Sequence, residues 1–495
     1  QGTILQKRYT GSYATLVSFL GRVNYSLASK YLFTVSFRSD GSSKFAPENR
    51  WGYFPSGAFA WNFGNEEFMK KLDFISQAKL RTSYGVTGNN RVSDFAYLSV
   101  MQQEVSSNSS NTKSGYYFNG DYIQGTVPTV IGNDKLKWER TENVDIGLDI
   151  GVFNDRINLT TDYYYKKTTD LLLNASLPTS TGYLNAFKNI GAVSNQGIEF
   201  TLSTANIVKE DFEWNSSFNI AFNNNKILEL NGDESSLTTR ITNWNAQFNN
   251  SMPYIALEGR NVALFYGFVF DGLYQLSDFD QLAGGNYQLK ADIPNNGNDR
   301  STIKPGHIKY KDINGDGLLD ANDQTVIGNP LPLHIGGFNN NFRYKQFDLN
   351  VFLQWSYGND VLNANRIVFE GAEGRPNLNM FEDYANRWSL DNPSSLLPVA
   401  GGYGPNVYSS RTVEDGSFLR LKTVSLGYTL PGSVLKKWKA ESIRIHASAQ
   451  NLITWTNYSG IDPEVSVRHT ALTPGFDWSP YPRARTIIMG LNVTF

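Results

Sequence analysis

The sequence predicts an all-β protein, an antiparallel transmembrane β-barrel with long extracellular loops. Three observations lead to this prediction. Apolar and polar residues alternate over segments of about ten residues, short and long connections alternate along the chain, and aromatic residues make up 14% of the 495 residues beside 43 glycines. Aromatic residues are frequent in strands, and a period of two gives each strand one apolar and one polar face.

The alternation is clearest in the last strand, whose apolar face consists of Ile487, Met489, Leu491, Val493 and Phe495. A soluble β-sandwich is the alternative for any one strand, because its inner face would be apolar as well. Charged residues such as Asp145, Asp149 and Arg444 recur on the polar faces, however. Charges at these positions favour a water-filled lumen over a second sheet packed on that side. At 419–424 the phase of the leucines breaks, which indicates a bulge or a strand entering a loop.

The connections orient the predicted barrel. Outer-membrane barrels have short periplasmic turns and long extracellular loops, and we expect long connections at 39–49, 89–137, 172–190, 226–332, 359–415 and 455–482. Counting between the connections gives about thirteen strands. Because bacterial single-chain barrels normally have an even number, we expect these strands to be the C-terminal part of a larger barrel. The alternative is one uncounted strand within Tyr254–Phe270.

Composition excludes several other classes of protein. The chain has 46 acidic and 44 basic residues, so charge implies no nucleic-acid partner. It has no cysteine and only four scattered histidines, which excludes disulfide scaffolds, thiol catalysis and cysteine-ligated metal sites. No apolar run approaches the roughly 18 residues of a transmembrane helix.

Nine segments of the chain resemble the C-terminal part of SusC/RagA-type TonB-dependent outer-membrane transporters of the Bacteroidetes. Their order and number together are specific, whereas any one could arise by chance. They are GRVNYS (21–26), RWGYFPSGAFAWNF (50–63), KLRTSYGVTGN (79–89), KWERTENVDIGLDIG (137–151), DRINLTTDYYYKKTTDLLL (155–173), NIGAVSNQGIE (189–199), YKDINGDGLLDANDQTVIGNP (310–330), FLRLKTVSLGYTLP (418–431) and GIDPEVS (460–466).

The resemblance implies import of a nutrient, an oligosaccharide or an oligopeptide, across the outer membrane. It also implies partners: a SusD-like surface lipoprotein on the extracellular loops, the TonB–ExbB–ExbD motor, and outer-membrane lipid around the barrel. Members of the family have a signal peptide, a TonB box, a plug domain and first barrel strands, and residues 1–495 contain no segment that resembles them. We therefore expect residues 1–495 to be the C-terminal portion of a plugged barrel of about 22 strands.

Aromatic residues in or near the long loops are the candidates for substrate contact, because rings can stack on sugars and their polar atoms can bind them. The alternative is an aromatic belt at the membrane rim. The candidates are Trp244, Trp355, Trp388, Tyr403 and Trp478.

Two other functions remain open. A glycan-degrading enzyme at the cell surface would need paired carboxylates, for which Glu370 with Glu373 or Glu382 with Asp383 are available in one loop. Clustered acids in loops are usually only solvated, so we expect no catalysis. The third possibility is a glycan-binding adhesin barrel that transports nothing.

The loop 226–332 contains an EF-hand-like segment, Asp312 to Asp323. The spacing predicts a structural Ca²⁺ site with oxygen ligands from positions 1, 3, 5, 7, 9 and 12 and a glycine, Gly317, at position 6. Position 12 is Asp where Glu is usual, and the flanks lack the helices of a true EF-hand. The alternative is a turn with solvated acids. The predicted ligands are Asp312, Asn314, Asp316, Leu318, Asp320 and Asp323.

Overall fold

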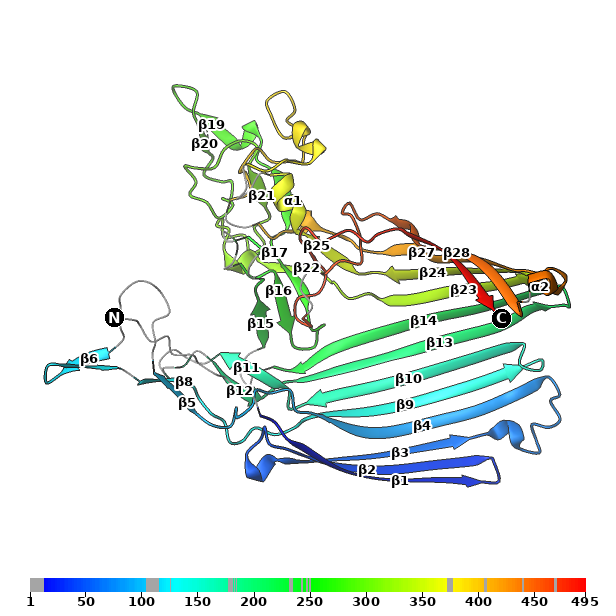
Figure 1. The fold of residues 1–495 in the computed structure, drawn as a ribbon. Helices are drawn as coiled ribbons and strands as arrows, with labels where there is room; N and C mark the ends of the chain where they lie inside the picture. The colour runs from blue at the N-terminus through cyan, green and yellow to red at the C-terminus, as the bar shows by residue number, and fades with distance from the viewer. Residues whose placement is uncertain are drawn as a thin grey trace, which may run out of the picture.

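The computed structural model describes residues 13–103, 115–124, 126–176, 181, 183, 185–230, 235–241, 244, 245, 248, 251–371, 377–404, 407–438, 440–466 and 470–495. Its main feature is one sheet of thirteen strands, in which each strand pairs antiparallel with its neighbours in chain order (Figure 1). We call this sheet the wall. The predicted fold and count of about thirteen strands are confirmed.

The strands of the wall are 9 to 18 residues long, as expected of strands that cross a bilayer at a tilt. They are β1 (Leu16–Leu27), β2 (Tyr31–Ser42), β3 (Trp51–Trp61), β4 (Ile75–Asn89), β9 (Glu139–Val152), β10 (Ile157–Thr169), β13 (Ala192–Val208), β14 (Phe212–Glu229), β23 (His334–Tyr344), β24 (Phe347–Tyr357), β27 (Phe418–Thr429), β28 (Ser442–Thr456) and β30 (Thr486–Thr494).

Short and long connections lie at opposite ends of the wall, which we call the turn end and the loop end (Figure 1). The long connections are residues 43–50, 90–138, 170–191, 230–333, 358–417 and 457–485. Those at 90–138 and 170–191 contain β5 (Val100–Gln103), β6 (Gly115–Phe118), β7 (Asp121–Gln124), β8 (Thr126–Val130), β11 (Leu172–Ser176) and β12 (Asn185–Asn189). The predicted positions of the loops therefore agree with the structure within a few residues.

The last three long connections contain short strands and a helix. They are β15 (Ser236–Thr239), β16 (Tyr254–Leu257), β17 (Leu264–Gly267), β18 (Phe270–Leu273), β19 (Phe279–Gln281), β20 (Tyr287–Leu289), β21 (Ile308–Tyr310), β22 (Thr325–Gly328), β25 (Asp360–Asn363), α1 (Ala364–Phe369), β26 (Val413–Asp415) and β29 (Phe476–Asp477). Strands β16 and β17 belong to a separate four-stranded sheet. The segment 254–270 is thus strand-forming, but it adds no strand to the wall.

The two faces of the wall differ in chemistry, as the alternation predicts. Ile146, Leu148 and Leu159 are exposed on the apolar face. On the polar face, Arg81 of β4 reaches across β9 to β10, because its Nε lies 2.8 Å from Asp149 and its Nη2 lies 2.8 Å from Asp162. Ion pairs of this kind need water or other polar groups beside them, as a lumen provides.

A bulge interrupts β27 where the leucine phase breaks. Leu421 and Thr423 pair with the adjacent β24 residues Leu353 and Phe352, so Lys422 is an extra residue. A bulge of this kind twists the strand and re-aims the side chains before it. The predicted break is confirmed as a bulge.

At the turn end, Glu66 links its own connection, between β3 and β4, to the turn between β1 and β2. Its carboxylate accepts hydrogen bonds from Lys30 Nζ at 2.8 Å, Tyr31 Oη at 2.7 Å and Trp61 Nε1 at 3.2 Å. These bonds, that of Lys30 first, lower the pKa of Glu66 from 4.5 to about 2. Its contribution to stability is therefore complete above pH 4.5 and is lost only as the pH falls toward 2.

Helices are few and short. Apart from α1, the α2 helix (Gly432–Trp438) lies in the turn between β27 and β28. Within the described ranges, no helix has the length and hydropathy needed to cross a membrane.

Arg81→Met is expected to destabilise the barrel of the full-length protein by about 1–2 kcal/mol, because it leaves Asp149 and Asp162 together without a cation. The figure is below that of a fully buried pair because Arg81 is 30% exposed. Urea unfolding in detergent, followed by tryptophan fluorescence, measures the effect. Arg343→Met is the control: among the described residues Arg343 pairs with one carboxylate, that of Glu213, and it is 55% exposed. A loss equal to that of Arg81→Met would contradict the ion-pair explanation.

Candidate functional site

The long loops pack into two lobes at the loop end. The first lobe is formed by connections 43–50, 90–138 and 170–191, and its core consists of Phe45, Val92, Ala96 and Leu136. The second lobe is formed by connections 230–333, 358–417 and 457–485, which share one large cluster of buried apolar residues. A smaller, separate cluster of Tyr274, Phe279, Leu289 and Ile303 lies within connection 230–333. In Figure 1 most of the second lobe is the green and yellow unit beyond β23 and β24, and its last connection is drawn in red. Because the three loops share a core, they fold together as one unit and do not move independently.

Four of the five predicted substrate residues lie inside the second lobe. Trp244 is 4% exposed; its Nε1 donates to Tyr408 Oη at 3.0 Å, and its ring lies 5.2 Å from that of Trp478. Trp388 is buried in the same cluster. Tyr403 is fully buried, and the guanidinium of Arg411 lies 5.5 Å from its ring. These rings build the core that shapes the lobe.

The fifth predicted residue, Trp355, is in strand β24 of the wall. Its ring stacks on Phe218 with 5.5 Å between centroids, and nearby His334 stacks on Tyr357 at 5.1 Å. Trp355 alternates with Gln354 and Ser356, which puts it on the apolar face. Its position fits the alternative given above, a belt of rings at the membrane rim.

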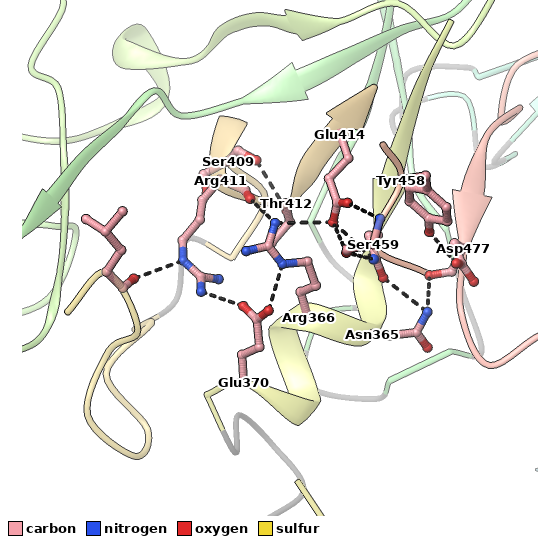
Figure 2. Close-up of polar contacts among 12 residues, drawn as sticks. Asn365, Arg366, Glu370, Ser409, Arg411, Thr412, Glu414, Tyr458, Ser459 and Asp477 are labelled. Carbon is pink, nitrogen blue, oxygen red and sulfur yellow. Dashed lines mark hydrogen bonds and ion pairs between the residues drawn. The ribbon is translucent and has the colours of Figure 1, made fainter. Parts of the chain in front are cut away.

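An ionic cluster joins the loops of the second lobe (Figure 2). Arg366 of α1 binds Glu370 at 2.8 Å and Glu414 at 3.2 Å, and Arg411 binds the other oxygen of Glu370. Glu414 in turn accepts the backbone N–H of Ser459 at 2.9 Å. One chain of charge-assisted bonds therefore ties connection 358–417 to connection 457–485.

Beside this cluster, Tyr458 donates a hydrogen bond to Asp477, and both side chains are buried. Burial, together with the neighbouring carboxylate, raises the pKa of Tyr458, and burial also raises the pKa of Asp477. The hydrogen bond compensates in part for removing the carboxylate from water. Neither residue was predicted from the sequence, because nothing local marks a pair 19 positions apart.

A second ionic cluster ties the last loop to the polar face of the wall. Arg420, 1% exposed on β27, donates to Asp462 and Glu464 at 2.6 Å each, and its Nε donates to Thr454 of β28 at 3.0 Å. Arg483 binds Glu464 as well, at 3.1 Å. The motif GIDPEVS supplies both carboxylates. Its repeated acids and the leucine phase break in 418–424 were the signals that could have predicted this contact.

Three hollows follow one another along strands β14, β23 and β24. The hollow at the loop end, ≈ 760 Å³, is lined by Tyr164, Glu199 and Asn223 among others. The next, ≈ 610 Å³, shares Glu199 with it and adds Asn219 and Gln354. The third, ≈ 180 Å³, is toward the turn end and is lined in part by three asparagines, Asn215, Asn341 and Asn350.

The EF-hand-like segment forms a compact loop on the second lobe. Asp312 accepts the N–H groups of Gly315 and Gly317 at 2.6 and 2.8 Å, and Asp323, fully buried, accepts that of Ile313 at 2.8 Å. Burial acts to raise the pKa of Asp323, but its bonds from backbone N–H groups outweigh this and lower the pKa.

Four other predicted ligands, Asn314, Asp316, Leu318 and Asp320, lie in the same turn with exposed side chains. Among the described residues, no three acidic, histidine or cysteine side chains are close enough together to hold a metal ion. The Ca²⁺ site stays a prediction.

Comparison with known proteins identifies the family. The model for the β-barrel of TonB-dependent receptor-like proteins matches residues 3–322. This chain belongs to that family. It is 38% identical over 487 residues to TonB-dependent receptor P3 of Formosa agariphila, covering 97% of this chain and 45% of the relative. It is 32% identical over 490 residues to TonB-dependent receptor SusC of Bacteroides thetaiotaomicron, covering 97% and 44%.

Solved structures agree on the fold of this TonB-dependent receptor chain. It superposes on a structure of the RagAB peptide transporter with a TM-score of 0.76 at 24% identity, covering 97% of this chain and 48% of the other. The chain spans just under half the length of the curated relatives it matches. The resemblance to SusC/RagA-type receptors and the outer-membrane location are confirmed.

The relatives that identify the family are receptors and not enzymes. Of the carboxylates considered for catalysis, Glu370 is held by two arginines, which leaves it no free proton-transfer role. Glu382 and Asp383 are exposed in a 3₁₀ turn, Glu382–Asn386. Glu373 lies outside the described residues.

Trp244→Ala in the full-length receptor is expected to destabilise the second lobe by about 3–5 kcal/mol, because it leaves a cavity where several rings meet. The wall should keep its stability, since its hydrogen bonds are unchanged. Hydrogen exchange followed by mass spectrometry measures both regions separately.

Tyr481→Ala is the control for this variant, because Tyr481 is 93% exposed. Unchanged protection of all three loops in Trp244→Ala would contradict a shared core.

Proposed function

We propose that the receptor containing this chain imports a nutrient, an oligosaccharide or an oligopeptide, across the outer membrane with energy from TonB–ExbB–ExbD. The observation that carries the proposal is the second lobe, in which three loops share one core. This lobe lies at the loop end of a wall that has one apolar face and one polar face. A barrel needs only short loops to close its strands, so loops of this length serve another purpose. The names of its relatives, SusC and RagAB among them, support the same function.

We further propose that a SusD-like lipoprotein covers the second lobe. Leu378, Phe381, Leu390 and Leu396 are exposed on connection 358–417. Exposed apolar side chains on a rigid surface favour a protein partner that removes them from water. Because the three loops of the lobe share one large core, such a partner would meet a surface of fixed shape.

Replacing residues 226–332 by a short Gly-Ser linker in the full-length receptor is expected to abolish uptake and co-purification of the lipoprotein. The strands should still assemble, because the only part of the wall that is deleted is the end of β14, residues 226–229. Uptake of labelled oligosaccharides and peptides into cells, with heat-modifiable gel migration as the assembly control, measures this. Ligand binding without TonB-dependent uptake by the intact receptor would favour an adhesin, and ligand hydrolysis would favour an enzyme.

We also propose that the segment Asp312–Asp323 binds Ca²⁺ and stiffens the second lobe. Its support is the ligand spacing together with two carboxylates, Asp312 and Asp323, that already face inward to the same turn. Ca²⁺ would supply charge compensation that backbone N–H groups supply only in part.

Asp316→Asn in the full-length receptor is expected to weaken Ca²⁺ binding at least tenfold, because it removes one charged ligand. Terbium luminescence of the purified protein, competed with Ca²⁺, measures this. Asp299→Asn is the control, since Asp299 lies in the same lobe and serves a turn, accepting Ser301 N–H at 2.9 Å. A map showing no ion within about 2.3–2.6 Å of the predicted oxygens in Ca²⁺ buffer would contradict the site.

A further inference from the structure

The polar face of the wall divides into a charged zone and an uncharged zone. On β4, β9 and β10 it carries Arg81, which compensates part of the negative charge of Asp149 and Asp162. On β14, β23 and β24 it carries amides and hydroxyls, and the charged residues Glu213, Arg343 and Asp348 of this face lie nearer the turn end. We call the amide and hydroxyl residues the amide stripe: Asn215, Ser217, Asn219, Asn223, Asn339, Asn341, Asn350, Gln354 and Ser356.

Register places the stripe on the same face as the ion pairs. Asp162 pairs with Glu199 of β13, and Glu199 pairs with Ala221 of β14. Residues two apart in a strand share a face, so Asn219 and Asn223 lie on the face of Asp162. Tyr164 Oη donates to Asn223 Oδ1 at 2.7 Å across β13, which is direct evidence of this shared face.

The stripe forms the floor of the three hollows. Asn219, Gly337 and Gln354 pair in one row across β14, β23 and β24. Because Gly337 has no side chain, the ring of Phe352 lies over it, with the Asn219 carboxamide beside that ring. Neither the Asn219 nor the Gln354 carboxamide makes a hydrogen bond to another described residue. Hollows of ≈ 610 and ≈ 760 Å³ are within the usual range for small-ligand sites.

The charged residues that line these two hollows are all acidic. Among the described residues lining them there is no lysine or arginine. Glu464 is neutralised by Arg420 and Arg483, whereas Glu199 has no ion pair within the described part of the chain. An anionic ligand would therefore lose water beside a carboxylate without gaining a cation.

We propose that the amide stripe is the ligand-facing wall of the import path and that it selects uncharged oligosaccharides over anionic ones. A carboxamide donates and accepts hydrogen bonds, as a sugar hydroxyl does, so the two match without charge. Phe352, in the same hollow, offers a flat ring for the apolar face of a sugar. The inference rests on the proposed import function and specifies its substrate.

The test compares uptake by the full-length receptor of labelled neutral oligosaccharides, uronate-containing oligosaccharides and peptides. Neutral oligosaccharides should be imported best. The double variant Asn219→Asp, Gln354→Glu should lower their uptake about tenfold, because two donor groups are lost in the path. Glu199→Gln should raise uptake of uronate-containing oligosaccharides.

Asn24→Asp is the matched control. Asn24 lies in β1, away from the hollows, and its Oδ1 accepts Thr34 Oγ1 at 2.9 Å, a bond that aspartate keeps. Its uptake should stay within about twofold of the unchanged receptor, with equal outer-membrane levels. Preferred import of anionic glycans or of peptides, or equal uptake by the double variant and the control, would overturn the proposal. Import of nothing in the panel, with or without TonB, would instead overturn the proposed function.

Discussion

The structure depends first on the requirement that a backbone crossing a bilayer pair all of its N–H and C=O groups within the protein. The inner strands of the wall meet this requirement by pairing on both sides with their chain neighbours, whereas β1 and β30 pair on one side only within the described residues. Strand pairing uses only the backbone, so the side chains can suit lipid on one face and water on the other. Alternate side chains of a strand point to opposite faces. The two chemistries of the wall, rings and aliphatics on one face and ion pairs and amides on the other, follow from that period.

Irregular backbone is confined to the ends of the wall for the same reason, and the two ends meet the constraint differently. At the turn end, a single carboxylate, Glu66, holds two turns together. At the loop end, long connections bury apolar residues with one another and so form folded lobes. Ionic clusters around Arg366 and Arg420 then fix the loops of the second lobe to one another and to β27. Arg420 is buried and Arg366 is half-buried, so removing either would leave carboxylates with less compensating charge.

Local periodicity predicted the wall well and the lobes poorly. Strand positions, loop positions and the break near Lys422 could be predicted because each depends on residues close in sequence. The role of Trp244 could not, because its neighbours Tyr408 and Trp478 are more than 160 residues away. Trp355 is different, because its place in the alternation of β24 already assigned it to the apolar face. That pattern was better evidence for its role than the presence of a tryptophan near a loop. Buried rings and exposed binding rings have the same composition, and only tertiary packing separates them.

The shared core of the second lobe also bears on how such receptors can diversify. Phe265, Val368 and Phe476 come from three different connections and pack in one cluster. A gene segment encoding one of these loops, transferred alone from a relative, would bring side chains that do not fit the other two. Exchange of the stretch from the end of β14 to the start of β30 would transfer the whole core at once. Recombination that keeps the lobe folded is therefore expected to have its crossovers in the strands flanking this stretch, and loops inside it should share a common ancestry.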